Sequence, residues 1–103
     1  MENIIYHITT LQEWNVAKTK GFYEAVSLSV EGFIHCSLAA QVDGVLERYF
    51  KGKPDLVKLT IDTSKLNNVL KYELAPSVNE VFPHIYGTLN LDAVIEVASV
   101  RFN

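Results

Sequence analysis

The order of the predicted secondary structure constrains this 103-residue chain more than any other feature. A strand, a helix, a short strand and a second helix are predicted in the first half of the chain, and most of the second half is predicted to be strands. The predicted strands, rich in β-branched or aromatic residues, cover residues 4–9, 33–36, 56–61, 69–74, 82–89 and 93–102. Because most strands are segregated from the helices, we expect an α+β fold with a mixed or antiparallel sheet.

Two segments have the spacing and the end signals of helices. In residues 11–20, apolar positions recur at helical spacing, and Thr10 stands three residues before Glu13, as in a capping box. Gly21 follows as a left-handed stop. A second helix is expected to begin after Ser37, which can cap it, and to end before a nearby glycine and proline. These are the two main helices that we expect.

Size and composition are those of an ordinary globular protein. Apolar residues make up 49% of the sequence and charged residues 20%, so we expect one domain, residues 1–103, with a single core. No apolar stretch approaches the roughly 20 residues that cross a bilayer. The opening Met1-Glu2-Asn3 lacks the basic leader of an export signal. We therefore expect a cytoplasmic protein without a membrane partner.

The charge distribution argues against a nucleic-acid partner. The net charge is -3, and the nine basic residues are spread along the chain, whereas nucleic-acid binders carry a broad basic surface. The one small cluster, Arg48, Lys51 and Lys53, falls at the expected end of the second helix, where cations interact favourably with the helix dipole. A small molecule is the expected partner, and any protein partner stays unidentified.

The three histidines share one local pattern. Each lies in a segment that we expect to be extended, and a hydroxyl residue follows two positions later, on the same face of the strand. The pairs are His7 with Thr9, His35 with Ser37, and His84 with Tyr86. The opposite face of each strand is apolar. Because a buried polar group without a partner costs about 1–3 kcal/mol, we expect the pairs to line one cleft where a ligand satisfies them.

The six side chains suit a polar, planar ligand such as a nucleotide. Imidazole exchanges protons near neutral pH, and the Thr9 and Ser37 hydroxyls both donate and accept hydrogen bonds. Tyr86 can stack on a planar ring, and Gly87 is either a turn residue or a place where a ligand approaches the backbone. We interpret the three histidines as candidate catalytic residues and all six side chains as candidate ligand contacts.

Two other interpretations of the histidine motifs are weaker. Three imidazoles can hold a catalytic zinc ion, but no pair has the short spacing of known metal motifs and no carboxylate accompanies them closely in sequence. Cys36 could be a nucleophile activated by His35, but adjacent strand residues point to opposite faces, so we expect a buried thiol. Glu31 is expected at a turn and Glu73 on a solvated strand face. We predict no metal site.

Three motifs of the chain resemble the signature of the family known as domain of unknown function 952. They are Ile5-Tyr6-His7-Ile8, Glu31-Gly32-Phe33-Ile34-His35-Cys36-Ser37 and Phe82-Pro83-His84-Ile85-Tyr86-Gly87, the last with Leu89-Asn90 after it. The resemblance covers nearly the whole chain. It implies an ADP-ribosyltransferase-like fold with a split, strongly bent β-sheet that clamps NAD.

The resemblance also implies roles for particular residues. His7, followed by Thr9, would contact a ribose of NAD, and His35 would take the place of the second histidine of the phosphotransferase-like branch. Many transferases of the superfamily have a catalytic glutamate at the third position, but the third motif here contains no acid. Glu31 or Glu73 would then have to stabilise the cation-like transition state of glycosidic cleavage.

Three hypotheses of function remain open. The first is an NAD- or nucleotide-binding enzyme of the ADP-ribosyltransferase type, in which His7 and Thr9 orient the ribose and His35 contacts the ligand or shuttles a proton. In this hypothesis His84 and Tyr86 close the pocket. The second is a module that senses a nucleotide through the same residues without turnover, which the missing glutamate favours. The third is a protein-interaction module whose cleft binds no ligand.

Overall fold

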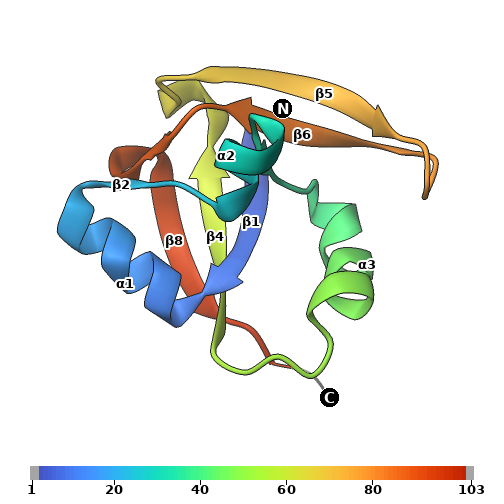
Figure 1. Cartoon of the computed structure of the whole chain (residues 1–103), viewed down its shortest axis with the longest axis horizontal. Helices are drawn as coiled ribbons and strands as arrows, with labels where there is room; N and C mark the ends of the chain where they lie inside the picture. The colour runs from blue at the N-terminus through green and yellow to red at the C-terminus, as the bar shows by residue number, and fades with distance from the viewer. Residues whose placement is uncertain (1–2, 102–103) are drawn as a thin grey trace.

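The computed structural model describes residues 3–101 as short helices followed by a strand-rich second half (Figure 1). The strands are β1 (Ile4–Thr10), β2 (Phe22–Tyr23), β3 (Ile34–His35), β4 (Leu56–Asp62), β5 (Val69–Ala75), β6 (Glu80–Tyr86), β7 (Leu89–Asn90) and β8 (Val94–Ser99). The α-helices are α1 (Leu11–Lys20), α2 (Val26–Glu31) and α3 (Val42–Val45). The predicted α+β class with antiparallel strands is confirmed, with three α-helices rather than two.

Two three-stranded antiparallel sheets, β1-β4-β8 and β3-β6-β5, form the frame of the molecule. Strands β2 and β7 pair separately. The large sheets meet at a bridge between Tyr6 of β1 and Ser37, where two backbone hydrogen bonds of 2.8 and 2.7 Å join them. Figure 1 shows the β5–β6 hairpin crossing the end of the other sheet. The expected split sheet agrees with this arrangement, and the ADP-ribosyltransferase-like assignment stays a prediction.

The main core lies where the inner faces of the sheets meet α1 and β2. Its fully buried side chains include Ile5, Ile34, Leu59, Ile61, Ile85 and Leu89. Ile34 and Ile85 are directly opposite each other in the β3–β6 register. Because successive strand residues point to opposite faces, burial of these two isoleucines turns the next pair, His35 and His84, to the outer face of the sheet.

The first helix forms as the sequence predicts. The Thr10 hydroxyl accepts a hydrogen bond from the Glu13 backbone N–H at 3.0 Å, and the Glu13 carboxylate accepts one from the Thr10 N–H at 3.5 Å. The helix ends at Gly21, whose φ of 96° is left-handed. Trp14 packs in the core. Local side-chain signals are sufficient to define this element.

The second predicted helix begins later and is less regular than expected. A 3-10 turn (Ala39–Gln41) leads into α3, and a π-helical turn (Leu46–Phe50) ends the segment. The cap predicted at Ser37 is wrong, because the Ser37 backbone is already bonded to Tyr6 at the joint between the sheets. The Gln41 side chain instead accepts a hydrogen bond from the Leu38 N–H at 2.9 Å.

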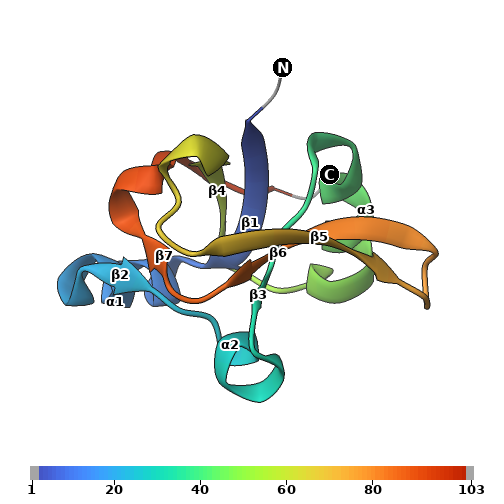
Figure 2. The ribbon, with the colours of Figure 1, turned by 90° about the horizontal axis from the view of Figure 1, so that it is seen from above.

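Helix α2 was not predicted, since it has no side-chain cap and consists of six residues. It projects from one side of the body next to β3 (Figure 2). Gly32, with φ 91°, ends it where the sequence indicates a turn. None of the helices within residues 3–101 is long and apolar enough to cross a membrane.

The strands depart from prediction at two places. Pro83 was expected to break the third histidine strand, yet β6 continues through it. The Pro83 carbonyl accepts a hydrogen bond from Cys36 N–H at 3.0 Å, so the missing proline N–H faces the same side, just beyond the end of β3. The ladder with β5 therefore loses no hydrogen bond, whereas on the other side the pair with Cys36 keeps only this one bond and β3 ends at His35. The last strand ends at Ser99, and Phe102, where it was expected to end, lies outside the described residues.

Candidate functional site

His35 and His84 face each other on the outer side of the β3-β6-β5 sheet. They are direct partners in the antiparallel register, and their ring centroids lie 5.2 Å apart, edge to face. The Phe33 ring stacks on His84 at 4.0 Å and meets Tyr86 at 5.3 Å. We call Phe33, His35, His84 and Tyr86 the aromatic face. It brings together two of the three predicted histidine motifs.

A carboxylate from a neighbouring element contacts each histidine of the aromatic face. Glu73 on β5 accepts hydrogen bonds from His84 Nδ1 at 2.7 Å and from the Tyr86 hydroxyl at 2.6 Å, both at Oε1. Glu31, at the end of α2, lies with both oxygens 3.2 Å from His35 Nε2. The hydrogen bonds from Tyr86 and then His84 lower the pKa of Glu73. Glu73 therefore carries its negative charge at neutral pH.

The contact with Glu73 defines which ring nitrogen of His84 donates a hydrogen bond and which has no protein partner. An ionised carboxylate only accepts hydrogen bonds, so His84 donates from Nδ1, and the neutral form of the ring then has its lone pair on Nε2. No protein partner of Nε2 is found within residues 3–101, and no buried polar side-chain atom of that range lacks a partner. Nε2 is therefore open to solvent, although the side chain as a whole is only 9% exposed.

His7 lies behind the aromatic face with both ring nitrogens occupied. Its Nδ1 bonds to the backbone carbonyl of His35, and its Nε2 lies 2.7 Å from the Tyr23 hydroxyl. Because the carbonyl can only accept, His7 donates from Nδ1 and Tyr23 donates to Nε2. Burial lowers the pKa of His7 to about 4, and the bond to the His35 carbonyl offsets only part of this effect. His7 is therefore neutral at pH 7.

The contacts of His7 continue to the protein surface. The Tyr23 hydroxyl lies 3.1 Å from Thr9 Oγ1, and the Thr9 hydroxyl donates to Glu13 Oε1 at 2.6 Å. We call His7, Tyr23, Thr9 and Glu13 the buried chain. The hydroxyl hydrogens of Tyr23 and Thr9 are already donated to His7 and Glu13, so none is left for the 3.1 Å contact. The buried chain thus connects His7 to a carboxylate at the start of α1.

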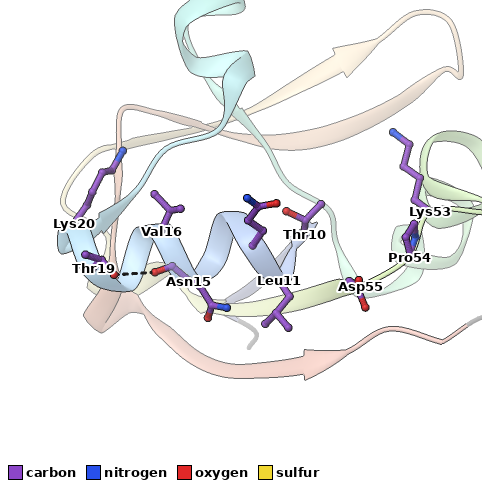
Figure 3. Close-up of a pocket in the computed structure, with 10 residues that line it drawn as sticks. Thr10, Leu11, Asn15, Val16, Thr19, Lys20, Lys53, Pro54 and Asp55 are labelled. Carbon is purple, nitrogen blue, oxygen red and sulfur yellow. Dashed lines mark hydrogen bonds between the residues drawn. The ribbon is translucent and has the colours of Figure 1, made fainter.

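Two hollows lie on the α1 side of the molecule. The larger, of about 820 Å³, runs between α1 and the segment from Lys53 to Asp55, and it includes no residue of the aromatic face or histidine motifs (Figure 3). The smaller, of about 450 Å³, lies between α1, β2 and α2 and is lined by Glu13 and Tyr23, the outer part of the buried chain. The aromatic face borders neither hollow.

The remaining candidate residues have structural positions. Ser37 is buried at the joint between the sheets, and Cys36 is buried in the core, where desolvation raises the pKa of its thiol. A Cβ on Gly87 would lie 2.5 Å from Asn68 Cγ, so the close approach at this glycine is made by a side chain of the protein. Within residues 3–101, no three His, Cys, Asp or Glu side chains gather to hold a metal ion.

Sequence reasoning placed the histidines and their hydroxyl neighbours on shared strand faces, and this is confirmed for two pairs. His7 and Thr9 both contact Tyr23, and His84 and Tyr86 both bond to Glu73. Glu31 and Glu73 were named as candidates for the acid, but their contacts with particular histidines were not predicted, and Tyr23 was missed. The contacts of Glu73 and Tyr23 follow from the pairing of distant strands, which no local pattern specifies. Phe33 carried a local signal, since it stands two residues before His35.

Comparison with known proteins gives one family and a well-matched fold. The family model described as "Protein of unknown function (DUF952)" matches residues 8–97. The X-ray structure of protein CC0527 from Caulobacter crescentus has 31% sequence identity and a TM-score of 0.88, covering 97% of this chain and 88% of that one. Its solution NMR structure has 30% identity and a TM-score of 0.84, covering 99% and 88%. No curated protein matches the chain.

Proposed function

The chain belongs to the DUF952 family of proteins of unknown function, and we propose that it binds NAD or a closely related nucleotide at the aromatic face. The observation that carries this proposal is the Glu73 carboxylate, which His84 and Tyr86 hold in place beside the Phe33 ring. A small-molecule nucleotide is the proposed partner, and the cytoplasm, where NAD is available, is the proposed location.

Oxidised nicotinamide suits this face because its ring is both planar and cationic. Aromatic rings attract a cation over their faces by about 0.5–2 kcal/mol, and Phe33 and Tyr86 are partly exposed. The charges of Glu73 and Glu31 add to the attraction for a cation. Lys71, whose ammonium group lies 4.8 Å from the Tyr86 ring, is the nearby positive group that a phosphate of the ligand could meet. Charge thus orients the dinucleotide with its nicotinamide end at Glu73.

We assign Glu73 as the acid that the third motif lacks. The third motif contains no carboxylate, but β5 pairs with β6 in the register Lys71 opposite His84 and Glu73 opposite Phe82. Glu73 therefore reaches the same face as the histidines from the neighbouring strand. Cleavage of a glycosidic bond passes through a cation-like transition state that a carboxylate stabilises. This favours an enzyme of the ADP-ribosyltransferase type, with Glu73 in the role of the catalytic glutamate.

In the ligand-free protein, His7 and Thr9 lie behind the aromatic face and both contact the Tyr23 hydroxyl. The Tyr23 hydroxyl occupies the space between His7 Nε2 and Thr9 Oγ1, at 2.7 and 3.1 Å. A ribose hydroxyl would contact both residues by taking the place of that hydroxyl. Ser37 contributes by joining β1 to the strand of His35, so that the buried and the outer histidines keep their spacing.

The second candidate function is a module that binds the nucleotide without turnover. Both donors to Glu73 act on the same oxygen, Oε1, and hold the carboxylate firmly even without a ligand. A carboxylate held in this way can bind a cationic ring whether or not the protein catalyses a reaction. Release of nicotinamide separates the two functions, because only the enzyme forms products. A protein-interaction module would bind neither form of NAD.

The charge of the nicotinamide ring provides the test. Titration calorimetry should show oxidised NAD binding at least about tenfold more tightly than reduced NAD, equivalent to about 1.4 kcal/mol, because reduction removes the ring's positive charge. Glu73→Gln keeps a hydrogen-bonding side chain of the same shape and should abolish this preference. Glu96→Gln, which removes an exposed carboxylate of β8 in the other sheet, should leave it intact. Absence of binding, or an unchanged preference in Glu73→Gln, contradicts the proposal.

A further inference from the structure

The free nitrogen of His84 has the features of a general base. We propose that His84 takes the proton of a hydroxyl acceptor, so that the second substrate of this site is an alcohol or water. The inference rests on the proposed function, since it requires NAD with its nicotinamide end beside Glu73. It assigns a role to a ring nitrogen whose direction Glu73 fixes and which has no hydrogen-bond partner within residues 3–101.

The orientation of His84 is fixed from several sides. Glu73 accepts from Nδ1 at 2.7 Å, and the Phe33 ring stacks on the imidazole at 4.0 Å with 20° between the planes. A carboxylate that holds one imidazole nitrogen as a donor leaves the other as the proton acceptor, and it stabilises the imidazolium that forms after proton transfer. Nε2 of His84 is therefore the basic atom, and Glu73 is positioned to stabilise the protonated ring.

His35 is less suited to this role. Its side chain is 54% exposed, and its contacts with Glu31 are longer, at 3.2 Å. A surface ion pair of this kind contributes little to orientation. The His35 ring lies edge-on to His84 at 5.2 Å, where it borders the space in front of His84. We therefore assign the base to His84 and leave His35 as a ligand contact.

The proposed step is balanced without a further reagent. The bond between ribose C1′ and the nicotinamide nitrogen breaks, and its electron pair neutralises the pyridinium ring. The acceptor oxygen forms a bond to C1′, and its proton passes to Nε2 of His84. The products are neutral nicotinamide, an ADP-ribosyl O-glycoside (ADP-ribose itself when the acceptor is water) and an imidazolium that later loses its proton to solvent.

The charges around His84 select the acceptor. Glu73 and Lys71 face it from β5, Tyr86 from β6 and His35 from β3, with Glu31 of α2 behind His35. Two carboxylates against one ammonium repel an acidic acceptor such as a carboxylate side chain. A guanidinium acceptor keeps its proton, because its pKa above about 12 far exceeds that of an imidazole base. A neutral hydroxyl meets neither obstacle.

The experiment uses the full chain with oxidised NAD, with water or added methanol as the acceptor. The wild type should release nicotinamide at a rate that rises with pH to a plateau as the base loses its proton, and methanol should yield methyl ADP-ribose. His84→Asn keeps an N–H near the position of Nδ1 for Glu73 but has no basic nitrogen. Its rate should fall by about 10²- to 10⁴-fold, the usual contribution of a general base, and lose the rise with pH.

A purely structural role of His84 gives a different result. In the proposed role, His84→Asn binds NAD with a dissociation constant within about threefold of the wild type, and added imidazole partly restores the rate of His84→Ala. Release by His84→Asn at the wild-type rate, or failure of imidazole to restore His84→Ala, overturns the general base. Binding by the wild type without any release also overturns it, while the proposed nucleotide binding stands. No binding of NAD by the wild type removes both proposals.

Discussion

His7 and His84 are both almost completely buried, but their partners give them opposite properties. His7 has a protein partner at each nitrogen, and burial lowers its pKa to about 4. His84 has a carboxylate on one nitrogen and solvent at the other. For these two histidines, the hydrogen-bond partners of the ring nitrogens, rather than the burial of the side chain, thus decide whether the residue stabilises the fold or can contact a ligand.

The lowered pKa of His7 makes the stability of the protein depend on pH. The unfolded chain binds a proton at His7 below about pH 6.5, whereas the folded chain binds it only below about pH 4, so acid favours the unfolded state between these values. This stabilisation is complete above pH 6.5 and is lost as the pH falls towards 4. We expect the free energy of unfolding to decrease by about 2 kcal/mol between pH 7 and pH 4.5.

Urea unfolding at a series of pH values measures this effect. Carboxyl groups, with ordinary pKa values of about 4, begin to titrate at the acid end of this window, so the effect of His7 is read as the difference between the wild type and a variant without it. His7→Gln cannot titrate, so its unfolding free energy should vary less over the same range. Equal slopes for the wild type and His7→Gln would show that His7 is not held neutral in the folded protein.

At the scale of elements, the end of β6 is held in place by the loop before β5. Gly87 has a φ of 147°, and Asn68 packs against it while its Nδ2 donates to the Thr88 carbonyl at 2.8 Å. A side chain at position 87 would be strained by the backbone conformation and would collide with Asn68. This contact adjoins Tyr86, and so it helps to place the aromatic face.

Gly87→Ala should therefore destabilise the protein by about 1–3 kcal/mol. Part of the cost comes from the collision with Asn68 and part from the backbone strain. Combining Gly87→Ala with Asn68→Ala removes the two closest contacts, with Asn68 Cγ at 2.5 Å and Nδ2 at 2.6 Å, and leaves the contact with Cβ at 2.9 Å and the backbone strain. The double variant should therefore lose less than the sum of the two single losses. Thermal unfolding of the four proteins checks this, and strictly additive losses would mean that the two residues do not interact.

At the scale of the whole molecule, features set by near neighbours in sequence were predictable and the distant pairings were not. The Thr10–Glu13 cap and the Gly21 stop define α1 locally, and the alternation in β3 and β6 placed the histidines on one face. The cap at Ser37 failed, because Ser37 is taken by the joint with β1. Glu73 reaches His84 through strand register, which depends on how the two sheets are assembled.

Because of the same assembly, His7 lies in the interior, whereas His35 and His84 lie on the outer face of their sheet. The joint at Tyr6 and Ser37 brings β1 beside β3, so that His7 contacts the backbone of His35 rather than its ring. The ligand-facing groups are then His35 and His84, together with the carboxylates that contact them. The central claim is that a nucleotide binds to this outer face.

NMR spectra of the ¹⁵N-labelled imidazole rings during a titration with oxidised NAD test that claim most directly. We expect the ring signals of His35 and His84 to shift and saturate together, at the dissociation constant found by calorimetry, and to need about tenfold more NAD for saturation in Glu73→Gln. If neither ring responds in the wild-type protein at millimolar NAD, the aromatic face is not a nucleotide site.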